Sequence, residues 1–211
     1  MSTAAVVLAA GRGSRAEGDT PKPLLADRGR PLVAWALDAA RASGCAPVLL
    51  VVGREGERVA AVAPPGVVVV TSPRWHEGIS QSLGAALDHL ATDRDVSAAC
   101  IGLADQPRVG AEAYRRLAEA GRTGAEIAVA TYHGERRNPV LLARSVWAAA
   151  RALTGDEGAR QLMADRVVVE VDCTDTGDPI DVDTLDDLRA LDRGARAHGV
   201  DDVDRAPHPD S

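Results

Sequence analysis

Residues 5–15 read AVVLAAGRGSR, and this stretch decides the fold. Six apolar residues, enough for a buried strand, end directly in a loop that holds two glycines and two arginines. Glycines let backbone N–H groups approach phosphates closely, and arginines neutralise phosphate charge. A further cation, Lys22, follows between Pro21 and Pro23. The stretch therefore predicts a strand whose carboxyl end opens onto a polyphosphate site.

Apolar runs and helical patterns alternate along the rest of the chain. The runs typical of strands are 4–10, 47–52, 67–71, 97–103, 126–132 and 167–171. Helical spacing of apolar residues is found over 31–43, 55–62, 78–91, 110–120 and 144–153. Several strands are apolar on both faces, which is typical of a parallel sheet covered on both sides. The pattern predicts a three-layer α/β/α fold with a doubly wound, mostly parallel sheet, whose ligands bind beyond the carboxyl ends of the strands.

One segment departs from this alternation. Residues 128–132 and 138–142 read as two strands around the polar stretch 133–136. We expect a small β-hairpin insert here, forming a wall of the active site.

Composition limits the class of protein. The chain has 211 residues, and we expect a single domain over 1–193 followed by a disordered acidic tail over 194–211. The net charge of −7 argues against nucleic acid as a partner, and the absence of a long apolar run argues against a membrane span. Three widely spaced cysteines form no zinc or disulfide pattern, so we expect reduced thiols in a cytoplasmic protein.

A dinucleotide-binding dehydrogenase is an alternative explanation of the glycine loop. Gly11-x-Gly13 matches part of that fingerprint, but the fingerprint needs a helix opening at the loop and an acid at the end of the next strand. Pro21 and Pro23 interrupt such a helix, and the next strand ends near Gly53, too far along the chain. The sequence disfavours this class.

Two acidic turns supply candidate metal ligands. Asp105 directly follows the strand at 97–103, and Asp181 and Asp183 precede a helix whose start Thr184 can cap. Magnesium prefers oxygen ligands and needs only one or two carboxylates when substrate phosphates complete its coordination. Asp181 and Asp183 lie on one side of an extended stretch, so either one could be the second ligand. The acids Asp186 and Asp187 suit the first turn of the helix and are expected to be structural.

In this order, the motifs resemble those of the molybdenum-cofactor nucleotidyltransferases, most closely the cytidylyltransferase branch. The resemblance runs from about residue 5 to residue 191 and depends on the loop 8–15 with Lys22, the turn 105–107 and the turn 181–184. It implies the Rossmann-like nucleotide-diphospho-sugar transferase fold. It also implies magnesium-dependent transfer of CMP from CTP to a phosphorylated acceptor such as molybdopterin cofactor, with release of pyrophosphate.

The resemblance also assigns roles to residues at matching positions. Arg15, Lys22 and Asp105 would be catalytic, and Asp105 and Asp183 would hold the magnesium ion. The nucleotide-binding residues would be Leu8, Ala9, Ala10, Gly11, Arg12, Gly13, Ser14, Arg15, Lys22, Ser82 and Asp105. Ala10 stands where guanosine-using relatives tend to have glycine, which favours CTP over GTP.

Three alternatives stay open from the sequence. Residues 21–25, PKPLL, also resemble sugar-phosphate nucleotidyltransferases, and a guanylyltransferase of the same family would share the motifs. Asn138 stands where the pterin enzymes commonly carry histidine. This difference bears on the identity of the acceptor more than on the class of reaction. A non-catalytic nucleotide-binding protein would keep the loop without turnover.

Overall fold

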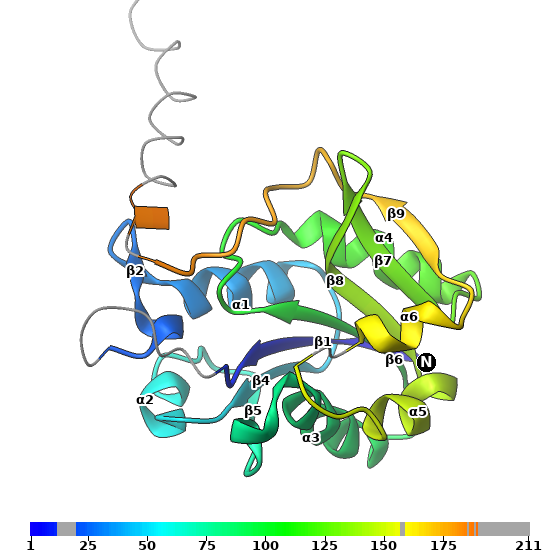
Figure 1. Cartoon of the computed structure of the whole chain (residues 1–211), viewed down its shortest axis with the longest axis horizontal. Helices are drawn as coiled ribbons and strands as arrows, with labels where there is room; N and C mark the ends of the chain where they lie inside the picture. The colour runs from blue at the N-terminus through cyan, green and yellow to red at the C-terminus, as the bar shows by residue number, and fades with distance from the viewer. Residues whose placement is uncertain (12–19, 157–158, 185, 188, 190–211) are drawn as a thin grey trace, which may run out of the picture.

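Seven strands form the central sheet in the described part of the chain. The computed structural model describes residues 1–11, 20–156, 159–184, 186, 187 and 189 (Figure 1). The strands are β1 (Ser2–Ala9), β4 (Val48–Val52), β5 (Val67–Thr71), β6 (Val96–Leu103), β7 (Ile127–Tyr132), β8 (Glu135–Ala143) and β9 (Val169–Asp172). Their order is β5-β4-β1-β6-β8-β7-β9. Only β8 runs antiparallel to its neighbours among these strands, so the predicted mostly parallel α/β sheet is confirmed.

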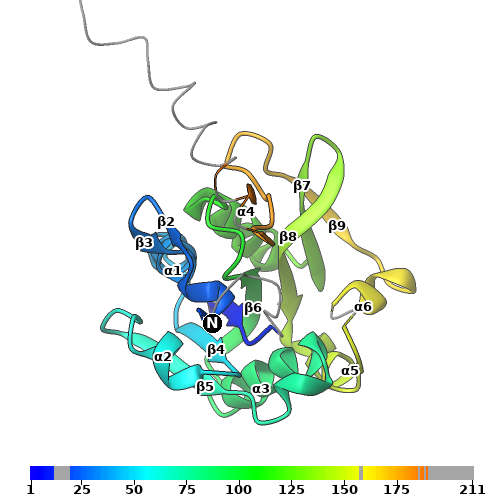
Figure 2. The same cartoon turned by 60° about the vertical axis from the view of Figure 1, so that its left-hand side comes forward.

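Helices cover both faces of this sheet, as Figure 2 shows. They are α1 (Leu32–Ala42), α2 (Gly56–Ala60), α3 (Ile79–Ala91), α4 (Ala111–Arg122), α5 (Trp147–Arg151) and α6 (Arg160–Ala164). Leu37 of α1 and Leu117 of α4 pack in one apolar cluster, while Leu87 of α3 and Trp147 of α5 pack in the other. The two clusters lie on opposite faces because alternate residues of a strand, such as Val6 and Val7, contribute to different ones.

The predicted hairpin is confirmed as β7 and β8. Its turn consists of His133 and Gly134, with φ values of 51° and 81°, and two positive φ values characterise the turn that best matches the twist of a hairpin. Strand β8 also pairs with β6, so the hairpin is an integral part of the sheet rather than an appended insert.

Several short elements were not predicted, including the 3₁₀ helices η1 (Lys22–Leu24) and η2 (Trp75–Glu77). A two-stranded sheet joins β2 (Ala26–Asp27) and β3 (Arg30–Pro31), and α6 lies between α5 and β9. Elements of two to five residues are too short to display a hydrophobic period. The expected helix over 144–153 is a 3₁₀ turn, η3 (Arg144–Val146), that continues into α5.

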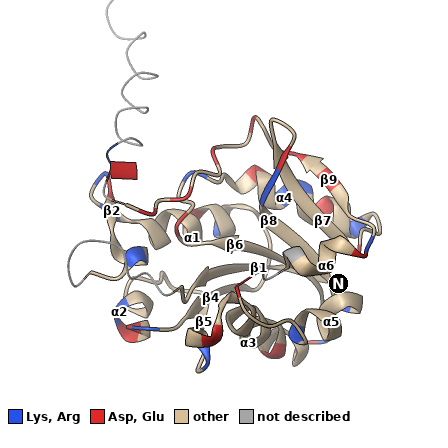
Figure 3. Cartoon of the chain, viewed as in Figure 1, with Lys and Arg blue, Asp and Glu red and all other residues tan. Residues whose placement is uncertain are grey.

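Charged side chains are interspersed over the described surface. In the view of Figure 3, acidic and basic residues are mixed along the helices and loops that the structure describes. No helix among the described residues is long and apolar enough to cross a membrane. The proposed tail over 194–211 lies outside the described residues.

Candidate functional site

Three side chains from distant parts of the sequence meet beyond the carboxyl ends of β1 and β6. Lys22 Nζ donates one hydrogen bond to Asp105 Oδ2 at 2.6 Å and another to Asp183 Oδ1 at 2.7 Å. The lysine lies 83 residues before one partner and 161 before the other. This ion-paired group lies at the edge of the sheet where a doubly wound fold binds its ligands.

Lys22 is presented by a short rigid turn. It opens the 3₁₀ helix η1 (Lys22–Leu24), and Pro21 and Pro23 flank it. Proline fixes φ on both sides, and Leu24 N donates to Pro21 O at 2.8 Å to close the turn. The lysine backbone is therefore held in place before any ligand arrives.

Asp105 takes its position from the end of the sheet. The Ala104 backbone N–H donates to Leu8 O at 3.0 Å, which extends the pairing of β1 and β6 by one residue. The chain then turns, and the Asp105 side chain, 27% exposed, leaves the end of the sheet toward Lys22. A rigid strand end therefore fixes this carboxylate.

Asp183 lies on the loop that follows β9, and backbone hydrogen bonds join this loop to the loop that follows β6 and carries Asp105. Val182 N donates to Asp105 O at 2.9 Å, and Asp178 N donates to Arg108 O at 3.0 Å. Beyond Asp183, Thr184 Oγ1 and the Asp187 carboxylate exchange hydrogen bonds with each other's backbone N–H groups. This reciprocal arrangement confirms that Thr184 caps the turn and that Asp187 is structural.

The two loops approach too closely for side chains at two glycines. A Cβ added to Gly110 would lie 2.1 Å from Thr176 O, and one added to Gly177 would lie 2.2 Å from Arg108 O. Gly177 also has a φ of 139°, which L residues rarely adopt. The sequence motifs gave no sign of this requirement, because it arises from packing between segments some 70 residues apart.

We expect Gly177→Ala to lower the free energy of unfolding by about 1–3 kcal/mol, since it forces both strain and a backbone clash. The matched control is Gly84→Ala in α3, where nothing lies within 4 Å of the added methyl group. Alanine in a helix should stabilise the protein by about 0.5–1 kcal/mol. Urea denaturation of both variants measures the difference, and equal stabilities would contradict the close approach.

Electrostatics at the site favour an additional cation. Burial alone would lower the pKa of Lys22, but the Asp105 and Asp183 carboxylates outweigh this effect and the pKa is raised. Burial, followed by the charge of Asp105, raises the pKa of Asp181. One ammonium group thus serves three neighbouring carboxyl groups. The carboxylate oxygens of Asp105 and Asp183 converge on the Lys22 ammonium. Carboxylate oxygens are also the ligands that a hard divalent ion prefers.

The described residues contain no cluster of three or more His, Cys, Asp or Glu side chains arranged to hold a metal. A divalent ion here would therefore depend on one or two carboxylates completed by substrate oxygens, as is usual for magnesium.

Lys22 carries a sequence signal that motif analysis missed. It is the only lysine in the 211 residues, and every other member of the 24 Lys and Arg residues is arginine. An ammonium is a compact charge on a flexible stem, whereas arginine presents a planar fork, so the two are not equivalent at a crowded site. A single lysine in a chain that otherwise uses arginine indicates a position with a specific chemical requirement.

A cleft of about 820 Å³ adjoins this group. Aliphatic side chains dominate its walls: Leu8, Ile79, Leu83, Ile101, Leu103, Val129 and Val140. Polar and charged residues also line it: Gln106, Asp156 and Asp181, together with Arg136, Arg137 and Asn138 of β8. Gln106 is 2% exposed; its Nε2 donates to Pro179 O, and its Oε1 has no hydrogen-bond partner among the described residues.

The structure describes most of the residues that the sequence analysis selected. Leu8 lines the cleft, Ala9 and Ala10 are buried at the end of β1, and Gly11 is exposed. Ser82 is 2% exposed in α3. The remaining loop residues of that selection, Arg12, Gly13, Ser14 and Arg15, lie outside the described residues.

Comparison with known proteins gives consistent relatives. Nicotine blue oxidoreductase of Paenarthrobacter nicotinovorans is 32% identical over 198 residues, which are 88% of this chain and 94% of that protein. The crystal structure of Rv0371c from Mycobacterium tuberculosis H37Rv in complex with manganese has a TM-score of 0.73 and 34% identity, covering 90% of this chain and 97% of that one.

A third relative matches over a shorter stretch. The 2-C-methyl-D-erythritol 4-phosphate cytidylyltransferase of Cereibacter sphaeroides is 46% identical over 67 residues, 32% of this chain and 30% of that protein. Residues 5–171 match the family described as the MobA-like NTP transferase domain, and they include β1, Lys22 and Asp105. The match spans most of the chain, and the resemblance inferred from the sequence motifs agrees with it: this chain belongs to the MobA-like NTP transferase domain family.

Proposed function

We propose that this chain transfers CMP from CTP to a phosphorylated small molecule, such as molybdopterin cofactor, and releases pyrophosphate with the help of magnesium. The observation that carries the proposal is the Lys22 ammonium held between Asp105 and Asp183. A cation and converging carboxylates at the carboxyl ends of β1 and β6 are groups that a triphosphate with its metal requires. Family membership supports the triphosphate as substrate.

The reaction needs positioning and charge neutralisation. An oxygen of the acceptor phosphate forms a bond to the α-phosphorus of CTP, the bond from that phosphorus to the bridging oxygen breaks, and pyrophosphate leaves. The acceptor oxygen is already ionised at neutral pH, so no side chain has to remove a proton. Lys22, together with Arg15 of the loop, would stabilise the charge that builds on the phosphates. Magnesium, when bound by Asp105 and Asp183, would supply further charge neutralisation.

The 820 Å³ cleft is the proposed acceptor site. Its aliphatic walls suit the flat face of a ring system, and the buried Gln106 Oε1 offers an acceptor to an N–H or O–H group. Asn138 also lines the cleft, and its amide can serve as donor or acceptor. A phosphorylated acceptor with a partly apolar ring and polar edges fits this lining.

CTP is the proposed nucleotide, because Ala10 matches the cytidine-using branch. The cytidylyltransferase relative supports the same base. A pyrophosphate-release assay with CTP, GTP, UTP and ATP, each with magnesium, manganese or EDTA, tests the proposal. We expect release only with a divalent metal and fastest with CTP. The acceptor panel should include molybdopterin cofactor and several sugar phosphates, since sugar-phosphate acceptance would favour the alternative transferase class.

Preference for GTP would identify a guanylyltransferase instead. Tight triphosphate binding without pyrophosphate release from any acceptor would overturn the enzymatic proposal and favour a nucleotide-binding role.

An oxidoreductase is a second candidate, and one observation favours it. The nicotine blue oxidoreductase relative covers nearly the whole of both chains at 32% identity. The cleft with aliphatic walls is the place where the compound in that relative's name, nicotine blue, would bind. Oxidation of NADH or NADPH in the presence of nicotine blue, followed by absorbance, tests this candidate. Activity there, with no pyrophosphate release from any triphosphate, would replace the transferase proposal.

A further inference from the structure

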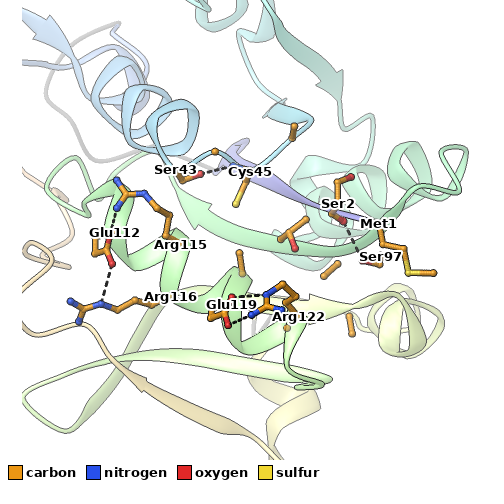
Figure 4. A pocket seen from close by; sticks show the side chains of 17 residues that line it. Met1, Ser2, Ser43, Cys45, Ser97, Glu112, Arg115, Arg116, Glu119 and Arg122 are labelled. Atoms are coloured by element: carbon orange, nitrogen blue, oxygen red, sulfur yellow. Dashed lines mark hydrogen bonds and ion pairs between the residues drawn. The ribbon is translucent and has the colours of Figure 1, made fainter.

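The ion pair between Asp27 and Arg108 differs from the ion pairs on the surface of the protein. A surface pair such as Arg115–Glu112 joins two exposed side chains three positions apart on α4 (Figure 4). Pairs of that kind contribute little to stability. Asp27 lies 81 residues before Arg108, and its side chain is 3% exposed, against 43% for Glu112. Its Oδ2 is 3.6 Å from Arg108 Nη2, so this pair joins two distant segments at a buried position.

Asp27 is held in place close to the lysine of the candidate site. It belongs to the β2–β3 hairpin, which lies beside α1 in Figure 2. Trp35 Nε1 of α1 donates to Asp27 O at 3.2 Å, and Leu32 N of the same helix donates to Leu25 O at 2.9 Å. Four residues separate Asp27 from Lys22, so a fixed Asp27 limits how far the lysine turn can move.

Arg108 is connected to the two carboxylates of the site. It follows Asp105 by three positions in the loop after β6. Its backbone oxygen accepts a hydrogen bond from Asp178 N at 3.0 Å, five positions before Asp183. Through its side chain and its backbone, Arg108 therefore contacts both of the segments that bring Lys22 and Asp183 to Asp105.

Burial makes the side-chain contact resistant to movement. A buried carboxylate is costly unless a charged or hydrogen-bonding partner stays close to it. Arginine suits this task because its guanidinium remains charged and presents a planar set of N–H donors. Any displacement of one segment relative to the other would draw the Asp27 carboxylate away from this cation.

We propose that Arg108 is a positioning residue, which holds Lys22, Asp105 and Asp183 at the distances that nucleotidyl transfer requires. Its guanidinium fixes the lysine segment through Asp27, and its carbonyl fixes the Asp183 loop through the Asp178 N–H. The inference rests on the proposed function, which supplies the reaction that this arrangement serves.

Cross-linking with a water-soluble carbodiimide measures the arrangement without any turnover. The reagent activates a carboxylate, a neighbouring amine attacks it, and an amide bond forms with net loss of one water. Lys22 is the only lysine of the chain and lies 2.6 Å from Asp105, so peptide mapping should find it linked to Asp105 or Asp183. In Arg108→Gln the link should form about tenfold more slowly, because reactions between held groups depend steeply on their placement.

A second variant and two controls make this result decisive. Asp27→Asn, which keeps the shape of the buried side chain, should slow the link as Arg108→Gln does. Arg30→Gln removes an exposed cation of β3 and should cross-link at the native rate. Ile127→Val shortens a fully buried side chain of β7, so it should lower stability without changing the rate. A native rate in Arg108→Gln, or an equal slowing in Ile127→Val, would overturn the inference.

Steady-state kinetics connect the arrangement to the reaction. Arg108→Gln and Asp27→Asn should each lower kcat for pyrophosphate release by about 10–10²-fold, with little change in KM for CTP. The double variant should be no slower than either single variant, because the two residues act through one contact. Multiplied losses would contradict that contact. A native chain that cross-links as expected but releases no pyrophosphate would refute the proposed function and leave the geometric role of Arg108 in place.

Discussion

Replacing Lys22 with alanine is expected to lower kcat for pyrophosphate release by about 10²–10³-fold, the usual cost of losing one preorganised charged donor. The ammonium lies 2.6 Å from Asp105 and 2.7 Å from Asp183, so it is already oriented at the site before substrate binds. Steady-state kinetics with CTP and the best acceptor measure the change. Circular dichroism should show an unchanged fold, because Lys22 lies on a short surface turn rather than in the core.

Two further variants sharpen this prediction. Lys22→Arg keeps the positive charge but not its compact shape, and we expect only partial activity from it. Arg30→Ala removes an exposed cation that pairs with Asp38 and should leave kcat unchanged. Binding of manganese alone should survive in Lys22→Ala, because the two carboxylates lose their competing cation. Wild-type turnover in Lys22→Ala would remove the lysine from the mechanism.

Asp105→Asn is expected to lower kcat by a similar factor of about 10²–10³ and to abolish the metal-dependent part of CTP binding. The substitution keeps the size of the side chain and removes the charge that a divalent ion needs. Isothermal titration calorimetry with CTP, with and without manganese, separates the two contributions. In the native protein the metal should tighten binding, and in the variant it should not.

Asp186→Asn is the matched control for this effect. Asp186 is an exposed carboxylate three residues beyond Asp183, paired only with Arg189 among the described residues. The Asp186→Asn variant should bind metal and CTP as the native chain does. If Asp105→Asn retains the native affinity for manganese with CTP, Asp105 is structural and the proposed metal site is wrong.

Local patterns predicted much of the fold. The run 67–71 coincides with β5, and the polar stretch after residue 132 predicted a hairpin that the structure contains. Both depend on the side chains of neighbouring residues, which a sequence displays directly. The strands β2 and β3 have two residues each, which is too short for a pattern of alternating apolar residues, and they were not predicted.

The site was only partly predictable for a related reason. Motifs identified Lys22, Asp105 and Asp183 separately, but the 161-residue separation of Lys22 and Asp183 hid their contact. The need for glycine at position 177 comes from the carbonyl of Arg108, which lies 69 residues earlier in the chain. Contacts of this kind follow from topology, which no local spacing encodes.

The single lysine has a practical consequence for the study of this enzyme. Apart from the α-amino group at the start of the chain, Lys22 is the only primary amine, and it lies inside the candidate site. Its raised pKa makes the free amine scarce at neutral pH, so acylating reagents meet a protonated, ion-paired group. Any ligand that displaces or covers this ammonium therefore changes the labelling of the one lysine side chain, while the α-amino group serves as an internal reference. Occupancy of the site can thus be followed by mass spectrometry without a mutation or an attached probe.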